Sequence, residues 1–362
     1  MTKRRFSKRD NAALVSAIDY LLQTAHRLAS PDGIPDTLME SAVLEDALVF
    51  LDDSETVKNA NKEMARLEGE NDVVFVNNSA LGSKSYLLVM QENVPGLVPY
   101  SLLPRRNGIT SAPKRILEKL DFLDVSKSLS RYQGHQPLIV EKHTDSHRGE
   151  GVKVCTPFQF LRKAKNDGLH IYQTFCYPWE RLSPDGHMRD CRVVMIGGEP
   201  AGYYVRKAKE PLIDASTGKL IEYPPSLTRV LTNVVQGGEV ESGLDADIKE
   251  RLYGVSKVVH DFMVAYTRLL NDQVGIHQPD VRYGFLAVDF LFYSTGKEVV
   301  AEVDYVPDLS ACPWKESFAE SYMKYMAELS QDRRRIFLRN GSLLEEKKTA
   351  ADKLGIPYGI IR

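Results

Sequence analysis

Cysteine is scarce in this chain, and its spacing excludes two classes of site. Zinc sites and disulfide frameworks need cysteines in close, regular patterns such as Cys-x-x-Cys. The 362 residues contain no such pair, and the four cysteines are scattered at Cys155, Cys176, Cys191 and Cys312. We therefore expect reduced thiols and a cytoplasmic protein.

Long apolar runs and an excess of one charge are also missing. No segment has the length and apolarity of a membrane-spanning helix, and the basic start, MTKRRFSKR, lacks the apolar stretch of a signal peptide. The chain has 47 Lys and Arg residues against 49 Asp and Glu, a net charge of -2. A nearly neutral chain is not an electrostatic nucleic-acid binder, so we expect neither a membrane nor a nucleic-acid partner.

Alternating apolar residues and turn residues predict a chain of mixed helices and strands. The stretches CRVVMIGGEPAGYYVRKA and FLAVDFLFYSTGKEVVAEVDYV each read as two strands joined by a glycine-containing turn. Helical spacing recurs at residues 11–29, 54–67, 112–123 and 245–271, and in ESFAESYMKYMAELS. Strands at residues 47–51 and 72–78 flank a polar helix, which indicates a parallel α/β layer before residue 110.

Lys142 stands between an apolar strand, residues 137–141, and a polar loop that contains Gly149 and Gly151. Burying an unpaired ammonium group is costly, so Lys142 needs a counter-charge. Glycines let backbone N–H groups turn toward an anion. A phosphate would satisfy both features, although a solvent-exposed hairpin fits the pattern too, and the spacing matches neither a Walker loop nor GxGxxG.

Three carboxylates lie within the last apolar hairpin, at Asp289, Glu302 and Asp304. Glu302 and Asp304 are two residues apart and therefore share one face of a strand, and Asp289 on the partner strand can share it. Carboxylates on one face repel unless a cation lies among them, and oxygen ligands suit Mg²⁺. The alternative is an exposed acidic sheet face.

Two arginines occupy the preceding hairpin. Asp190 and Arg192 share one face of their strand, and Arg206 ends the next strand. Arginine forks neutralise phosphate or acyl-phosphate oxygens by paired hydrogen bonds. Surface ion pairs of these arginines with Asp190 or Glu199 are the alternative.

Taken in order, five segments resemble the ATP-grasp superfamily, in particular the glutathione synthetase and RimK-like carboxylate–amine ligases. They are PLIVEK…RGEGV, YQTF, RDCRVVMIGGEPAGYYVR, TNVVQGG and VDF…EVDYVP, between about residues 137 and 313. The resemblance implies an α+β fold with an α/β N-terminal layer, in which the nucleotide lies between two α+β subdomains. The implied units are residues 1–34 (basic arm and helix), 35–110 (pre-ATP-grasp domain), 111–180 (small subdomain), 181–330 (large subdomain with the metal site) and 331–362 (charged tail).

The resemblance also implies a role for each matching residue. Lys142 would bind the α- and β-phosphates, and the loop from Ser146 through Gly149 to Gly151 would close over the triphosphate. The implied adenine-side residues are Tyr172, Gln173, Thr174 and Phe175. Asp190 would lie near the ribose or substrate, Asn233 near phosphates or metals, and Arg192 and Arg206 around the transferred phosphoryl group, while Asp289, Glu302 and Asp304 would bind metal.

The implied activity is formation of an amide or peptide bond through an acyl phosphate, with ATP and two Mg²⁺ ions, for which Mn²⁺ can substitute. The implied partners are a small carboxylate and an amine, such as amino acids or a peptide, and further copies of the chain in a homo-oligomer. A kinase of a hydroxylated or phosphorylated metabolite and a non-catalytic ATP-binding regulatory protein are the alternatives.

The chain departs from the family pattern at three places. Asp304 stands where the family usually has asparagine, although aspartate also binds Mg²⁺. An upstream phosphate lysine is expected, and Lys114, Lys119 and Lys127 are equal candidates. Residues 207–229 exceed what a minimal member needs and form either a specificity insert or a plain surface loop.

Overall fold

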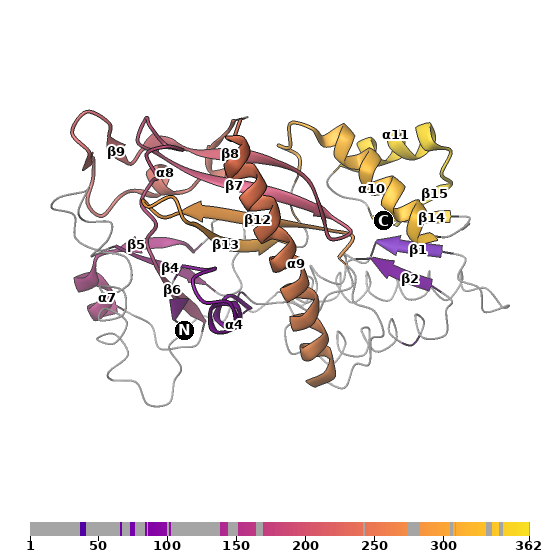
Figure 1. Ribbon diagram of the computed structural model, residues 1–362, viewed down its shortest axis with the longest axis horizontal. Helices are drawn as coiled ribbons and strands as arrows, with labels where there is room; N and C mark the ends of the chain where they lie inside the picture. The colour runs from indigo at the N-terminus through magenta and orange to yellow at the C-terminus, as the bar shows by residue number, and fades with distance from the viewer. Residues whose placement is uncertain are drawn as a thin grey trace, which may run out of the picture.

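The structure is a computed structural model (Figure 1). It describes residues 37–40, 66, 73–76, 84, 86–99, 101–102, 138–143, 151–163, 169–241, 243–273, 283–304, 307, 309–330, 335–339 and 343–361. Outside these residues lie the helices predicted at 11–29 and 112–123, the strand at 47–51, nearly all of the helix at 54–67, and five residues with expected site roles, Lys114, Lys119, Lys127, Ser146 and Gly149.

The central sheet has five antiparallel strands: β7 (His187–Ile196), β8 (Glu199–Pro211), β11 (Glu239–Glu241), β12 (Phe285–Phe292) and β13 (Glu298–Asp304). Their order is β11-β8-β7-β12-β13, and both predicted hairpins, β7–β8 and β12–β13, are confirmed. In the first hairpin turn Gly197 and Gly198 have φ values of 57° and 88°. Positive φ at both central positions is what a two-residue type I′ turn requires.

Helix α9 (Ala246–Gln273) covers one face of the central sheet and runs beyond its edge (Figure 1). It corresponds to the helix predicted from residue 245. Its apolar side packs with the sheet, so that Met263 shares a buried core with Val193 of β7 and Val288 of β12.

The second face of the central sheet is covered by helix α10 (Lys315–Ser330) along only part of its length. Val194 of β7 packs there in the same core as Phe318. Alternate residues of a strand point to the same side, so Arg192 and Asp190 lie on this face as well, further along β7. One face thus changes from apolar to charged along its strands.

A smaller antiparallel sheet, in the order β3-β6-β4-β5, packs against the charged end. It consists of β3 (Ser101–Leu102), β4 (Ile139–His143), β5 (Lys153–Cys155) and β6 (His170–Thr174), and helix α7 (Pro157–Lys163) follows β5. Leu138 and Phe175 form a buried cluster with Met188 of β7, and Val140 packs against it. Because Lys142 is two residues from Val140, its side chain leaves β4 on the side of the central sheet.

Helix α4 (Tyr86–Asn93) was not predicted from the sequence. Its buried residues Tyr86, Leu87 and Met90 join the core that α9 forms with the central sheet. The helix thereby brings residues from the N-terminal quarter of the chain next to β13.

The prediction that residues 331–362 form a charged tail is wrong. These residues include β14 (Arg335–Arg339), α11 (Leu344–Leu354) and β15 (Tyr358–Ile361). The two strands form a parallel sheet with β1 (Thr37–Glu40) and β2 (Val73–Val76), in the order β15-β14-β1-β2. Burial of Ile336 and Leu338 against α10 explains why this charged segment is folded.

Residues 207–229 extend β8 and then form a short hairpin, β9 (Ile213–Asp214) with β10 (Lys219–Leu220), followed by α8 (Leu227–Val230). Arg229 ties this segment to β8 because its Nη1 donates to the carbonyl of Pro211. The segment is a folded extension of the large sheet, and its role in specificity stays a prediction.

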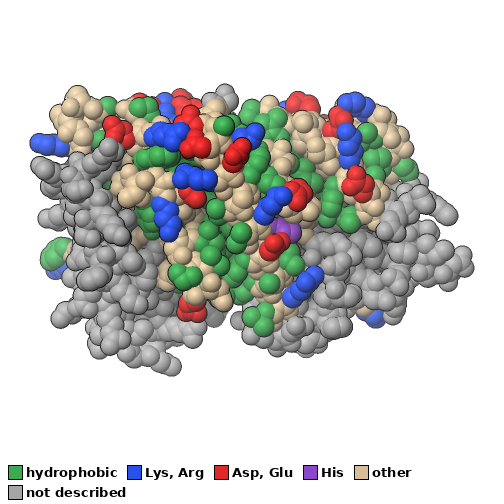
Figure 2. All heavy atoms as spheres, in the orientation of Figure 1, with side chains coloured by type: hydrophobic (Ala, Val, Ile, Leu, Met, Phe, Trp, Pro, Cys, Tyr) green, Lys and Arg blue, Asp and Glu red, His purple; other side chains and the backbone are tan. Residues whose placement is uncertain are grey.

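Helices and antiparallel sheets are thus combined in one chain, which confirms the predicted α+β class. Figure 2 shows positive and negative side chains interspersed over the described part of one face. Among the described residues, no helix combines the length and the apolarity needed to cross a bilayer.

Candidate active site

Strand register gathers most of the predicted charged residues on the uncovered part of one sheet face. Asp190 of β7 is opposite Arg206 of β8, and Arg192 of β7 is opposite Asp289 of β12. Asp289 is in turn opposite Glu302 of β13. Directly opposed residues share a face and touch, so opposite charges meet across two strand pairs, and two carboxylates meet across the third.

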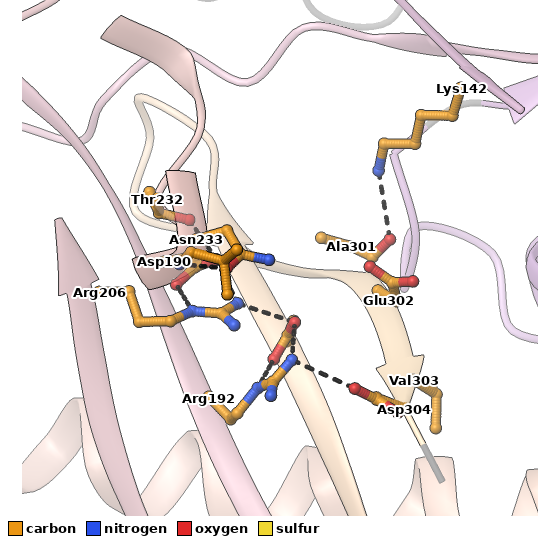
Figure 3. A network of polar contacts seen from close by, with 12 residues as sticks. Lys142, Asp190, Arg192, Arg206, Thr232, Asn233, Ala301, Glu302, Val303 and Asp304 are labelled. Carbon is orange, nitrogen blue, oxygen red and sulfur yellow. Dashed lines mark hydrogen bonds and ion pairs between the residues drawn. The ribbon is translucent and has the colours of Figure 1, made fainter. Parts of the chain in front are cut away.

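Four of these residues, Asp190, Arg192, Arg206 and Asp289, form what we call the arginine cluster (Figure 3). Arg192 donates from Nε and Nη2 to the two oxygens of Asp289, at 2.7 and 2.8 Å. Arg206 binds Asp190 in the same forked way, at 2.8 and 2.6 Å, and its Nη2 is also 2.7 Å from Asp289 Oδ2. None of the four is more than 7% exposed.

Charge pairing decides the ionisation of this cluster. Burial alone raises the pKa of Asp289, but Arg192 and Arg206 more than offset it and hold that pKa well below its ordinary value. Burial likewise lowers the pKa of Arg192, and Asp289 reverses the sign, so that the arginine pKa is raised. Asp289 and Arg192 therefore keep their charges across the physiological range.

A second group, Lys84, Lys142 and Glu302, lies beside the arginine cluster, and we call it the lysine group. Lys142 Nζ donates to the carbonyl oxygen of Ala301 at 3.4 Å, and Lys84 Nζ is 3.1 Å from Glu302 Oε1. The lysine-bearing strand β4 and the acidic hairpin therefore face each other (Figure 3). Lys84, which precedes α4, was missed because nothing in its neighbourhood marks it as a site residue.

Interactions within the lysine group also shift the pKa values of Lys142 and Glu302. Burial lowers the pKa of Lys142, and Glu302 opposes this only in part, since Lys84 lowers it further. Burial raises the pKa of Glu302, but Lys84 and Lys142 act against it, and the net pKa lies below the ordinary value. An anion close to both lysines would relieve their mutual repulsion.

The edge of the central sheet is closed at β13 by groups from outside the sheet. The Tyr86 hydroxyl accepts from Val303 N at 2.8 Å and donates to Val303 O at 3.1 Å. Val300 N donates to Leu97 O at 2.8 Å. Because unpaired edge groups are otherwise exposed, these contacts fix the strand that carries Glu302.

The three predicted metal ligands are not equivalent. Both oxygens of Asp289 are taken up by arginines, whereas the side chains of Glu302 and Asp304 are 34% and 33% exposed. Within the described residues no three His, Cys, Asp or Glu side chains are close enough to hold one metal ion. Glu302 and Asp304 fit Mg²⁺ as hard oxygen donors, and Asp289 instead serves as counter-ion to the arginines.

The predicted adenine-side segment lies in β6, in the interior of the small sheet. Tyr172 and Gln173 are paired with β3 and with β4, so they are not on a free strand edge. Gln173 Nε2 also donates to Ser101 Oγ at 2.8 Å. Thr174 is also paired with Ile139 of β4, and Phe175 N donates to the carbonyl oxygen of Leu138 at 3.3 Å. The adenine role of this segment stays a prediction.

Asp190 and Asn233, two further predicted site residues, differ in the hydrogen bonds that their side chains make. The oxygens of Asp190 accept from Arg206 and from the hydroxyl of Thr232, the latter at 2.6 Å, and its role near the ribose or substrate stays a prediction. Asn233 caps a short helical turn, η2 (Val234–Gln236), and is close to Asp190 in Figure 3. Gly151, at the end of the predicted phosphate loop, has a φ of 72°.

No protein-family model matches the sequence, and no curated protein matches it. Among solved structures, the chain is similar to D-cycloserine synthetase DcsG, with 14% identity, a TM-score of 0.41, and coverage of 81% of this chain and 97% of that one. It is also similar to the ATP-grasp ligase PsnB complexed with a minimal precursor (13% identity, TM-score 0.39, coverage 75% and 71%). A third is the D-alanine-D-alanine ligase from Coxiella burnetii (11% identity, TM-score 0.43, coverage 83% and 72%).

Proposed function

We propose that this chain is an ATP- and Mg²⁺-dependent ligase that joins a carboxylate to an amine through an acyl phosphate. Amino acids or a peptide are the proposed substrates. The ordered motifs between residues 137 and 313 support an ATP-grasp arrangement, in which the nucleotide lies between the small and the central sheet.

The observation that carries the proposal is the position of Lys142. Its Nζ is 3.4 Å from the carbonyl oxygen of Ala301, next to Glu302, and the arginine cluster occupies the same sheet face. ATP and a carboxylate substrate are both anions, so their reaction needs cations on both sides of the transferred group. The two sheets supply these cations from opposite sides.

Each cation has a distinct part in the proposed site. Lys142 and Lys84 would bind nucleotide phosphates, while Arg192 and Arg206 would act on the transferred phosphoryl group. The contacts of Arg206 use Nε and Nη2, so Nη1 has no partner among the described residues and remains able to donate. Because carboxylates already fix the rest of the guanidinium, little reorganisation accompanies charge development.

Mg²⁺ would be held by Glu302 and Asp304, whose side chains are the more exposed carboxylates of the site. When bound, it supplies charge neutralisation of the phosphates. Asp289 contributes indirectly, since it holds both arginines in place. Thr174, Phe175 and Asn233 would line the nucleotide, and the loop that ends at Gly151 would cover it.

The reaction takes two steps. A carboxylate oxygen attacks the terminal phosphorus of ATP and ADP leaves; the amine nitrogen then attacks the acyl carbon, loses a proton and expels phosphate. No protein nucleophile is needed. This agrees with the four cysteines, none of which forms a disulfide. Burial raises the pKa of the Cys155 thiol to about 12 and that of the Cys312 thiol to about 11. Free, unreactive thiols also fit the reducing cytoplasm.

The proposal is tested by phosphate release from ATP in the presence of pooled amino acids and small peptides. Turnover should require an acid and an amine together, together with Mg²⁺. Glu302→Ala should abolish Mg²⁺-dependent turnover, whereas Glu298→Ala, at the other end of β13, should leave it near wild type.

Each other outcome has a clear meaning. Turnover with a single hydroxyl acceptor and no amine would support a kinase. ATP binding without turnover would support a regulatory protein. Near-normal activity of Glu302→Ala would reject the metal assignment.

A further inference from the structure

Thr232, which the sequence did not single out, closes the arginine cluster on the side of the loop that carries Asn233 (Figure 3). Its hydroxyl donates to Asp190 Oδ2 at 2.6 Å. The same oxygen accepts from Arg206 Nη2 at 2.6 Å, and Thr232 is 7% exposed. Two donors on one oxygen define the plane of the carboxylate, and the carboxylate plane in turn defines the position of the Arg206 fork.

The loop that follows Thr232 has little room for another shape. The carbonyl of Asn233 accepts from Gln236 N at 2.9 Å and from Gly238 N at 3.1 Å, and its side chain accepts from Val235 N at 3.0 Å. A Cβ on Gly238 would lie only 2.3 Å from the Thr232 carbonyl oxygen. Anchoring Thr232 therefore anchors Asn233 as well.

We propose that Thr232 is a positioning residue of the proposed reaction. Its hydroxyl holds Asp190 so that Arg206 presents the free Nη1 toward the transferred group, and it ties the Asn233 loop to the same cluster. The role in catalysis rests on the proposed ligase function, but the geometric role does not. Thr232 acts through Asp190 and touches no reacting atom.

The kinetic part of the test compares Thr232→Val with Thr232→Ser in the full chain. Valine keeps the shape and removes the hydroxyl, and loss of a hydrogen bond to a charged group is worth about tenfold. We expect kcat for phosphate release to fall about tenfold in the valine variant and to stay near wild type in the serine variant. The Kd for ATP should change less than kcat in both variants, because Thr232 reaches the nucleotide only indirectly, through the Asn233 loop.

A double-mutant cycle with Arg206→Lys asks whether Thr232 acts through Arg206. If it does, the second substitution adds little to the first. Fully additive losses in kcat would overturn this route.

The geometric part uses NMR of the full chain labelled with ¹⁵N-arginine and needs no turnover. The Arg206 Nε–H signal is assigned by its loss in Arg206→Lys. We expect it to shift in Thr232→Val, to return in Thr232→Ser, and to stay unchanged in the control Thr228→Val, whose hydroxyl contacts only Ser226.

An Arg206 signal that is identical in wild type and Thr232→Val, or that Thr232→Ser fails to restore, overturns the proposal. Thr232→Cys provides the same comparison if the valine variant does not fold. A wild-type chain that turns over no ATP would reject the ligase function, while the NMR comparison would still decide the role of Thr232.

Discussion

In the arginine cluster, neighbouring strands of one sheet hold each guanidinium through carboxylates, whereas both ammonium groups of the lysine group come from outside that sheet. Arg192 and Arg206 are bound by Asp190 and Asp289 at distances between 2.6 and 2.8 Å. Lys142 reaches across from the small sheet and donates to the backbone of β13 at 3.4 Å.

The difference shows two ways of keeping positive charge beside one strand. Folding of the central sheet sets the arginine positions, because their partners are cross-strand neighbours. The lysine positions depend on how the small sheet and the start of α4 lie against β13. We therefore expect the first group to control stability and the second to control nucleotide affinity.

The largest effect should follow from Asp289→Asn. The amide keeps the shape but removes the charge that two buried arginines share, and leaving buried charges uncompensated costs about 3–5 kcal/mol. The free energy of unfolding in urea should fall by about this amount. Asp304→Asn is the matched control: Asp304 is 33% exposed and 3.6 Å from Arg192, so its loss should cost less than about 1 kcal/mol.

The pH dependence gives this prediction a second test. The pKa of Asp289 is lowered on folding, so its contribution is present above the unfolded pKa of about 3.9 and is lost as the pH falls toward the folded pKa. The gap in stability between wild type and Asp289→Asn should therefore narrow in acid. Equal losses of unfolding free energy in the two variants at neutral pH would contradict the role of Asp289 as the shared counter-ion of the arginine cluster.

Lys142→Met should act on nucleotide binding. Removing a phosphate ligand should raise the Kd for ATP by about tenfold or more, measured by calorimetry. The melting temperature should not fall, because a buried ammonium group is itself unfavourable. The outcome would show that the lysine group has a binding role, in contrast to the arginine cluster.

Lys153→Met is the control for Lys142→Met, since Lys153 is on the adjacent strand β5 with a side chain 62% exposed. It should leave ATP affinity unchanged. Burial lowers the pKa of Lys142, so wild-type affinity should weaken as the pH rises toward that lowered pKa, and Lys142→Met should lack this loss. An unchanged Kd in Lys142→Met would reject the phosphate role.

The face that carries the site could be predicted from the sequence, but its internal pairing could not. The two-residue period of strands placed Arg192 beside Asp190 and Glu302 beside Asp304. The register between strands decides that Asp289 lies between two arginines, and no local pattern states this register. In the structure both Asp289 and Asp190 are arginine partners, while the metal role of Asp289 and the ligand role of Asp190 stay predictions.

Elements whose partners are distant in the sequence were missed for a related reason. Strands β1 and β14 pair across about three hundred residues, and a four- or five-residue strand has too few positions to show a period. Helix α4, which follows Lys84, is only eight residues long, with apolar residues in its first part and polar residues at its end, so it lacks an amphipathic pattern. By contrast, the sequence patterns of α9 and of both hairpins extend over many residues. These elements were predicted from the sequence, and the structure confirms them.

The smallest effect should follow from Tyr86→Phe, which loosens the strand that carries Glu302. The Tyr86 hydroxyl serves both backbone groups of Val303 and is 1% exposed, so its removal should cost about 1–2 kcal/mol of unfolding free energy. Because β13 is the edge strand, the Mg²⁺ concentration needed for half-maximal turnover should rise while the Arg206 Nε–H signal stays in place. Tyr253→Phe, in a tyrosine that packs against the same core, should change neither quantity, and equal losses in the two variants would show that Tyr86 contributes only packing.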